Sequence, residues 1–209
     1  MMEKRKYIRL YGFDYSRIGA YFVTVCTHKR QRLFGEIPIK PNGWFKETGH
    51  FQYSKMEGEM SLSPVGAHPC VRPKTIEMIE YWIHRIPTKF KFVTIDYYVI
   101  MPDHIHLILF FNDIRDAHMG APLQKNSDDF QKIKENHKYD EKLYDVIKWF
   151  KTMTTNEYIH LVKEGIIPPF DHHVWQRGYY DHVIRNRDDL YECRKYIKNN
   201  PARWLNENK

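Results

Sequence analysis

The run "YYVIMPDHIHLILFF", residues 97–111, constrains the fold more than any other part of the sequence. Two apolar segments rich in β-branched and aromatic residues, 91–100 and 104–111, flank the tripeptide MPD. Such a connection is short enough to join two antiparallel strands. The sequence therefore predicts a β-hairpin at the centre of the chain.

The second of these strands carries two histidines on one face. Side chains alternate along a strand, so His104 and His106 should share a face with Ile108 and Phe110, while the opposite face is entirely apolar. Imidazoles about 6–7 Å apart along a strand can converge on one metal ion or phosphate. They can equally be two half-buried histidines satisfied by hydrogen bonds, and a His-x-His pattern alone does not decide.

Periodicity elsewhere completes an alternation of strands and helices. Strands are predicted at 20–27 and 174–186, and helices at 73–87, 144–162 and 187–200, each from β-branched composition or helical spacing of apolar residues. The order β-α-β-β-α-β-α is typical of an α+β fold, a ferredoxin-like antiparallel sheet with helices packed on it.

The chain length favours one domain. A chain of 209 residues with 42% hydrophobic and 15% aromatic content can bury one core, so we expect a single domain over 1–209. Segments 40–73 and 112–141 are polar, contain Gly and Pro and lack steady periodicity. We interpret them as insertions or long connections at the rim of the sheet.

The cysteines and the N-terminus bear on cellular location. Cys26, Cys70 and Cys193 are odd in number and far apart, which suggests neither a disulfide framework nor a paired-cysteine zinc site. The N-terminus lacks the apolar core of a signal peptide, and no apolar run approaches membrane-spanning length. We expect a cytoplasmic, nucleoid-associated protein that does not enter a membrane.

The terminal helix carries a second polar pair. Tyr196 and Asn200 are four residues apart, so they stack on one helix face beside the apolar stripe of Leu190, Cys193 and Ile197. A hydroxyl and an amide at that border could point into the same crevice as the histidines. We expect Pro201 to stop this helix. The alternative is a packing tyrosine and a helix-ending asparagine, and spacing alone favours it.

In order along the chain, "YFVTVCT", "MPDHIHLIL", "VWQRGYYDHVIRN" and "YIKNNPARW" resemble a known family. They resemble the single-tyrosine HUH transposases of the IS200/IS605 type, and most closely the REP-associated tyrosine transposase branch. The likeness covers most of the chain outside the two suspected insertions. It rests on the His-hydrophobe-His signature at 104–106 and on the Tyr-Ile-x-x-Asn-Pro pattern at 196–201.

The resemblance implies an HUH endonuclease fold and a metal-dependent endonuclease and strand transferase. His104, His106 and Asn200 would bind Mg²⁺ or Mn²⁺, and Tyr196 would be the nucleophile that forms a 5′-phosphotyrosine. The expected substrate is single-stranded DNA that folds as a hairpin, bound by a monomer or a homodimer. The insertion-sequence enzymes carry Gln where this chain has Asn200, which favours the REP-associated branch.

DNA contacts are predicted from charge and aromatic content. The formal net charge is +7, and residues 1–32 carry eight Lys or Arg against two Asp or Glu. Candidate phosphate contacts are Arg5, Lys6, Arg9, Lys29, Arg30, Arg32 and Lys151, candidate base-stacking residues are Trp175, Tyr179 and Tyr180, and His182 is a possible extra polar group. The alternatives are packing of these aromatics beneath the sheet and a solvated lysine.

Two rival functions remain at this stage. A catalytically inactive protein with the same fold would bind hairpin DNA with steep salt dependence but would not cleave it. A cyclic-phosphate hydrolase would need two His-x-Thr/Ser motifs, and this chain has no second copy.

Overall fold

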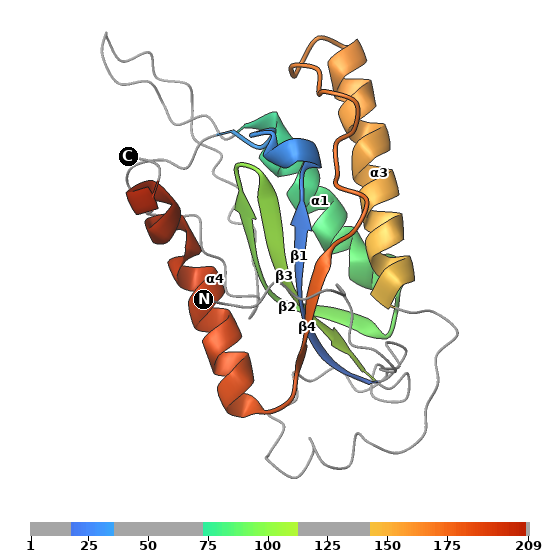
Figure 1. Cartoon of the computed structure of the whole chain (residues 1–209). Coiled ribbons are helices and arrows are strands. Elements are labelled where there is room, and N and C mark those ends of the chain that lie inside the picture. The colour runs from blue at the N-terminus through green and yellow to red at the C-terminus, as the bar shows by residue number, and fades with distance from the viewer. Residues whose placement is uncertain (1–17, 36–72, 113–142, 208–209) are drawn as a thin grey trace, which may run out of the picture.

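The computed structural model describes residues 18–35, 73–112 and 143–207 (Figure 1). The elements are β1 (Gly19–Cys26), a 3₁₀ turn (His28–Arg30), α1 (Lys74–Lys89), β2 (Val93–Met101), β3 (His104–Phe111), α3 (Leu143–Lys163), β4 (Tyr180–Ile184) and α4 (Arg187–Glu207). The suspected insertions lie almost wholly outside the described residues, as do Arg5, Lys6 and Arg9.

The four strands form one antiparallel sheet in the order β2-β3-β1-β4. The hairpin predicted at the MPD turn is confirmed, since β2 pairs with β3 and Met101 lies opposite His104. β1 lies in the middle of the sheet between β3 and β4. This order is that of a ferredoxin-like sheet and confirms the α+β prediction.

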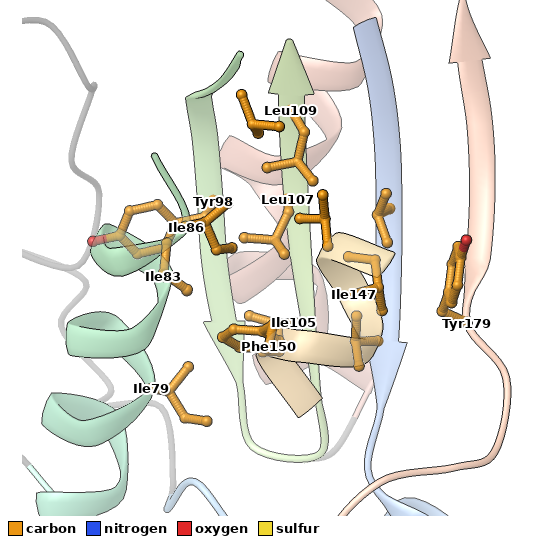
Figure 2. Close-up of a cluster of buried hydrophobic side chains, with 14 of the residues drawn as sticks. Ile79, Ile83, Ile86, Tyr98, Ile105, Leu107, Leu109, Ile147, Phe150 and Tyr179 are labelled. Atoms are coloured by element: carbon orange, nitrogen blue, oxygen red, sulfur yellow. The ribbon is translucent and has the colours of Figure 1, made fainter. Parts of the chain in front are cut away.

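The larger core lies between the sheet and the helices α1 and α3. On β3, Ile105, Leu107 and Leu109 are fully buried on this face, as their alternation predicted. They meet Ile83 of α1 and Phe150 of α3 (Figure 2). This face contributes most of the apolar burial.

Among the described residues, helix α4 covers the opposite face, so the sheet lies between α4 on one side and α1 with α3 on the other (Figure 1). Ile197 and Leu190 of α4 pack with Ile108 of β3 in a smaller apolar cluster. The two histidines of β3 lie on this same face because they alternate with the residues of the larger core.

Helix α4 begins as predicted but ends later. Asn186 caps its first turn, because its Oδ1 accepts a hydrogen bond from the Asp189 N–H at 2.8 Å. The prediction that Pro201 stops the helix is wrong, since α4 continues to Glu207. A proline removes one backbone hydrogen bond, and packing of Trp204 and Leu205 against the smaller cluster offsets that loss.

The predicted strand at 174–186 forms only over Tyr180–Ile184. In the segment before it, the carbonyls of Gln176 and Gly178 accept hydrogen bonds from the Lys151 ammonium, and Trp175 makes only an isolated bridge to Thr27. Tertiary contacts therefore replace the sheet ladder there. Within the described ranges, no helix combines the length and apolar content needed to cross a membrane.

Candidate metal and tyrosine site

His104 begins β3, directly after the hairpin turn, and its ring is held by a buried carboxylate. Its Nδ1 is hydrogen-bonded to Oδ1 of Asp103, and both residues are almost fully buried. Oδ2 of Asp103 in turn pairs with Nε of Arg30 at 3.2 Å. A carboxylate on Nδ1 fixes the imidazole tautomer and leaves the lone pair of Nε2 free to bind an electrophile.

His106 lies two residues further along β3, and its side chain points toward that of His104. Its Nδ1 lies 2.8 Å from the hydroxyl of Thr24, its cross-strand partner on β1. Its Nε2 lies 3.1 Å from Nε2 of His104 and 3.2 Å from the side-chain amide nitrogen of Asn200. The two imidazoles therefore lie together, each also hydrogen-bonded through Nδ1, and the amide of α4 completes the cluster.

This donor set fits a divalent metal ion. When both Nδ1 atoms donate, both Nε2 lone pairs face one another at 3.1 Å, an arrangement that is repulsive without a proton or a cation between them. Two neighbouring ligands at about 2.1 Å from an octahedral ion lie about 3.0 Å apart, close to the observed separation. A half-turn of the Asn200 amide would present its oxygen to such an ion.

Its surroundings hold His106 in the neutral form. Burial, followed by repulsion from His104 and Arg30, lowers the pKa of His106 to about 2. The imidazole is therefore uncharged at physiological pH, which is the form that binds a metal.

Tyr196 lies beside this cluster, one turn before Asn200 on α4. Its ring makes edge contacts with His106 at 5.2 Å and with Phe22 at 5.8 Å between centroids, and Arg203 lies over it at 5.5 Å. The residue is 40% exposed, and no described residue hydrogen-bonds its hydroxyl. The phenol can therefore meet a substrate from solvent while its ring stays against a histidine of the cluster.

A hollow of about 450 Å³ opens on the outer side of Tyr196. Its walls include Phe22 of β1 and two cations of α4, Lys195 and Arg203. This hollow adjoins the tyrosine rather than the histidines. Glu192 also lines the hollow, so a polyanion lying there would meet two cations and one anion on its way to the phenol.

Basic residues also border the histidines, on the 3₁₀ turn after β1 and just beyond it. Arg30 contacts Asp103, and Arg32 lies over Trp204, whose ring is 6.0 Å from His104. Lys29 is further out, in an exposed ion pair with Asp171. Of these predicted phosphate contacts, Arg30 and Arg32 thus lie near His104, each through one intervening residue.

Three other predicted DNA contacts lie elsewhere. Trp175 and Tyr179 belong to the larger core, and the indole of Trp175 donates to the Thr154 hydroxyl at 2.9 Å, so neither ring is open to a base. Lys151 donates to the two carbonyls before β4, and burial lowers its pKa to about 8. The packing alternative holds for Trp175 and Tyr179, while Lys151 is half-buried with its ammonium on these two carbonyls.

The other two predicted DNA contacts, Tyr180 and His182, lie on β4. Tyr180 is 56% exposed at the start of the strand and keeps an open ring face. His182 is on the α4 side of the sheet but hydrogen-bonds Asp189, so it is separate from the histidine cluster.

Sequence reasoning missed the residues that orient the cluster. Asp103 was interpreted only as part of a turn, although an acidic residue next to a His-x-His pair is a usable signal. Thr24 and Phe22 reach the histidines across the β1–β3 ladder. Their role depends on strand register, for which the sequence of β1 alone has no signal.

Comparison with known proteins supports the fold. No protein-family model matches the chain. An uncharacterized protein of Haemophilus influenzae is 28% identical over 203 residues, 97% of this chain and 91% of that protein. A REP-associated tyrosine transposase, solved bound to a REP hairpin, has a TM-score of 0.51 at 15% identity, covering 93% of this chain and 73% of its own. The chain thus shares the fold of that transposase.

Proposed function

We propose that this protein is a metal-dependent endonuclease and strand transferase for single-stranded DNA that displays a hairpin. The observation that carries the proposal is the contact of the Tyr196 ring with His106, at the edge of the His104–His106–Asn200 cluster. A tyrosine, two imidazoles and an amide meet here from two elements far apart in sequence. The fold shared with a hairpin-bound transposase supports the choice of substrate.

Tyr196 is the nucleophile in this proposal. Its oxygen attacks the phosphorus of a phosphodiester, the bond from phosphorus to the 3′ oxygen breaks, and the 5′ phosphate stays on the tyrosine. The phenol releases its proton to solvent, and the 3′ oxygen takes up a proton from solvent and leaves as a hydroxyl. Because a phosphodiester bond is exchanged for a phosphotyrosine bond, a 3′-hydroxyl can later attack the adduct and reseal a strand without ATP.

His104, His106 and Asn200 would hold Mg²⁺ or Mn²⁺. A bound divalent ion supplies Lewis-acid polarisation of the phosphate and neutralises developing negative charge. Asp103 and Thr24 keep both imidazoles turned inward. Imidazole suits Mn²⁺ better than Mg²⁺, so we expect Mn²⁺ to bind more tightly when the substrate and water complete the coordination.

The test uses hairpin oligonucleotides with single-stranded flanks, taken from palindromes near the gene and incubated with Mn²⁺ or Mg²⁺. A denaturing gel should reveal a covalent protein–DNA band that requires metal and disappears in Tyr196→Phe. Tyr191→Phe is the matched control, because Tyr191 lies on the same helix and is more exposed. Tight hairpin binding without any covalent band under either metal would leave a DNA-binding protein and contradict the proposal.

A further inference from the structure

A second cluster of metal-ligand types lies on the α4 side of the sheet. His182 is on β4, directly opposite Phe22 of β1. Asp189 and Cys193 are four residues apart in the first two turns of α4 and so share one helix face. One ligand atom from each of the three residues lies within 4.8 Å of the other two, and all three side chains are partly buried.

The contacts inside this cluster hold His182 against Asp189, beside a free thiol. Nε2 of His182 lies 2.8 and 3.0 Å from the two carboxylate oxygens of Asp189. One of those oxygens also accepts the backbone N–H of Arg185, which holds the carboxylate in place at the turn into α4. Cys193 is a free thiol that no described residue hydrogen-bonds.

Metal binding at Cys193 would require the loss of its thiol proton. Burial, followed by the carboxylates of Asp189 and Glu192, raises the pKa of Cys193 to about 11. The sulfur therefore keeps its proton in the free protein, and a bound cation would displace that proton. Two carboxylates beside this partly buried sulfur give a local potential that attracts a positive ion.

We propose that His182, Asp189 and Cys193 bind a zinc-class divalent cation. One imidazole nitrogen, one carboxylate oxygen and one thiolate sulfur form a set that suits Zn²⁺, with the fourth tetrahedral position left to water or a ligand. The His104–His106–Asn200 cluster offers no sulfur, so the two clusters differ in the ions they select.

The two clusters are physically separate. Phe22 lies between them. Its ring stacks on the His106 ring with 5.2 Å between centroids, and its backbone pairs with His182 across the β1–β4 ladder. A cation at the second cluster would link β4 to the first two turns of α4. Cys193, the last of its ligands, lies about one turn before Tyr196. Such a cation would therefore hold the helix that carries the tyrosine without touching the first cluster.

Cobalt absorption tests this site directly, because a Co²⁺–thiolate bond gives a near-ultraviolet charge-transfer band and tetrahedral Co²⁺ gives intense visible bands. The full chain with Cys26→Ala and Cys70→Ala retains Cys193 as its single thiol. One equivalent of Co²⁺ should produce both sets of bands, and one equivalent of Zn²⁺ should abolish them. Adding Cys193→Ser should remove the charge-transfer band, and His182→Ala should weaken binding at least tenfold.

Two results would overturn the inference: no band at stoichiometric Co²⁺, or a band that survives Cys193→Ser. If the double cysteine variant does not fold, the difference spectrum between the wild type and Cys193→Ser gives the same information. The readout is independent of DNA chemistry. His104→Ala and Tyr196→Phe should both retain the cobalt bands, so loss of cleavage and loss of this site are distinguishable.

Discussion

The two faces of the sheet bury different kinds of side chain. Against α1 and α3, β3 presents Ile105, Leu107 and Leu109, and the packing is almost wholly apolar. Against α4, the same strand presents His104 and His106. Because both sets alternate along one strand, a single eight-residue segment serves the main core and the candidate site at once.

Several polar groups on the α4 face are held by a charged partner. Asp103 holds His104, and Arg194 of α4 forms a two-pronged pair with Asp96 of β2 at 2.6 and 2.7 Å. Buried polar groups contribute little net stability even when they are well paired, but they fix geometry. We infer that the apolar face supplies most of the stability, while the polar pairs on the α4 face fix the positions of the site residues.

The largest expected effect is on the apolar face. Phe150→Ala removes a fully buried ring beneath β3 and should lower the free energy of unfolding by about 3–5 kcal/mol. Tyr196→Phe removes a hydroxyl without a described partner and should change it by less than about 0.5 kcal/mol. Urea denaturation measures both. Equal losses would contradict the division between the two faces.

The next effect concerns the orientation of His104. Asp103→Asn keeps the shape of the side chain but removes the carboxylate on Nδ1, so the affinity for Mn²⁺ should fall about 10- to 100-fold. Isothermal titration calorimetry measures this affinity. Asp96→Asn is the matched control, since it breaks an ion pair on the same face away from the histidines. An equal loss in both variants would refute a specific role for Asp103.

A smaller loss of stability is expected at Lys151. Lys151→Met keeps the aliphatic stem but leaves the carbonyls of Gln176 and Gly178 without their donor, which should cost about 1–2 kcal/mol of unfolding free energy. The salt dependence of hairpin binding should stay unchanged. A shallower salt slope would restore Lys151 as a phosphate contact.

The smallest effect is on DNA affinity. Arg32→Gln should reduce the slope of log affinity against log salt by about 0.7, the contribution of one phosphate contact to a single strand. Filter binding at several salt concentrations measures the slope. Arg85→Gln, on α1 across the sheet, should leave it unchanged. Identical slopes in the wild type and Arg32→Gln would remove this arginine from the DNA interface.

Periodicity predicted the parts of the fold and the site that depend on one segment. The alternation of β3 predicted which residues enter the larger core and that His104 and His106 share a face. The four-residue spacing predicted that Tyr196 and Asn200 share a helix face. These features follow from backbone geometry, which a single strand or helix determines by itself.

Features that depend on contacts between segments escaped prediction. Thr24 reaches His106 only through the β1–β3 register, and Lys151 reaches the carbonyls before β4 from a distant helix. Pro201 stays inside α4 because tertiary packing outweighs the local preference to end the helix. The ring of Trp175 is of a type that can stack on a base, but it packs in the larger core.

The most direct test of the account is to locate the covalent link to DNA. After reaction with Mn²⁺ and a hairpin substrate, the protein is digested with protease and nuclease, and the nucleotide-bearing peptide is sequenced by mass spectrometry. We predict a single modified peptide with the phosphate on Tyr196. Attachment at Tyr191 or Tyr180, both more exposed, would contradict the claim that contact with the histidine cluster selects the nucleophile.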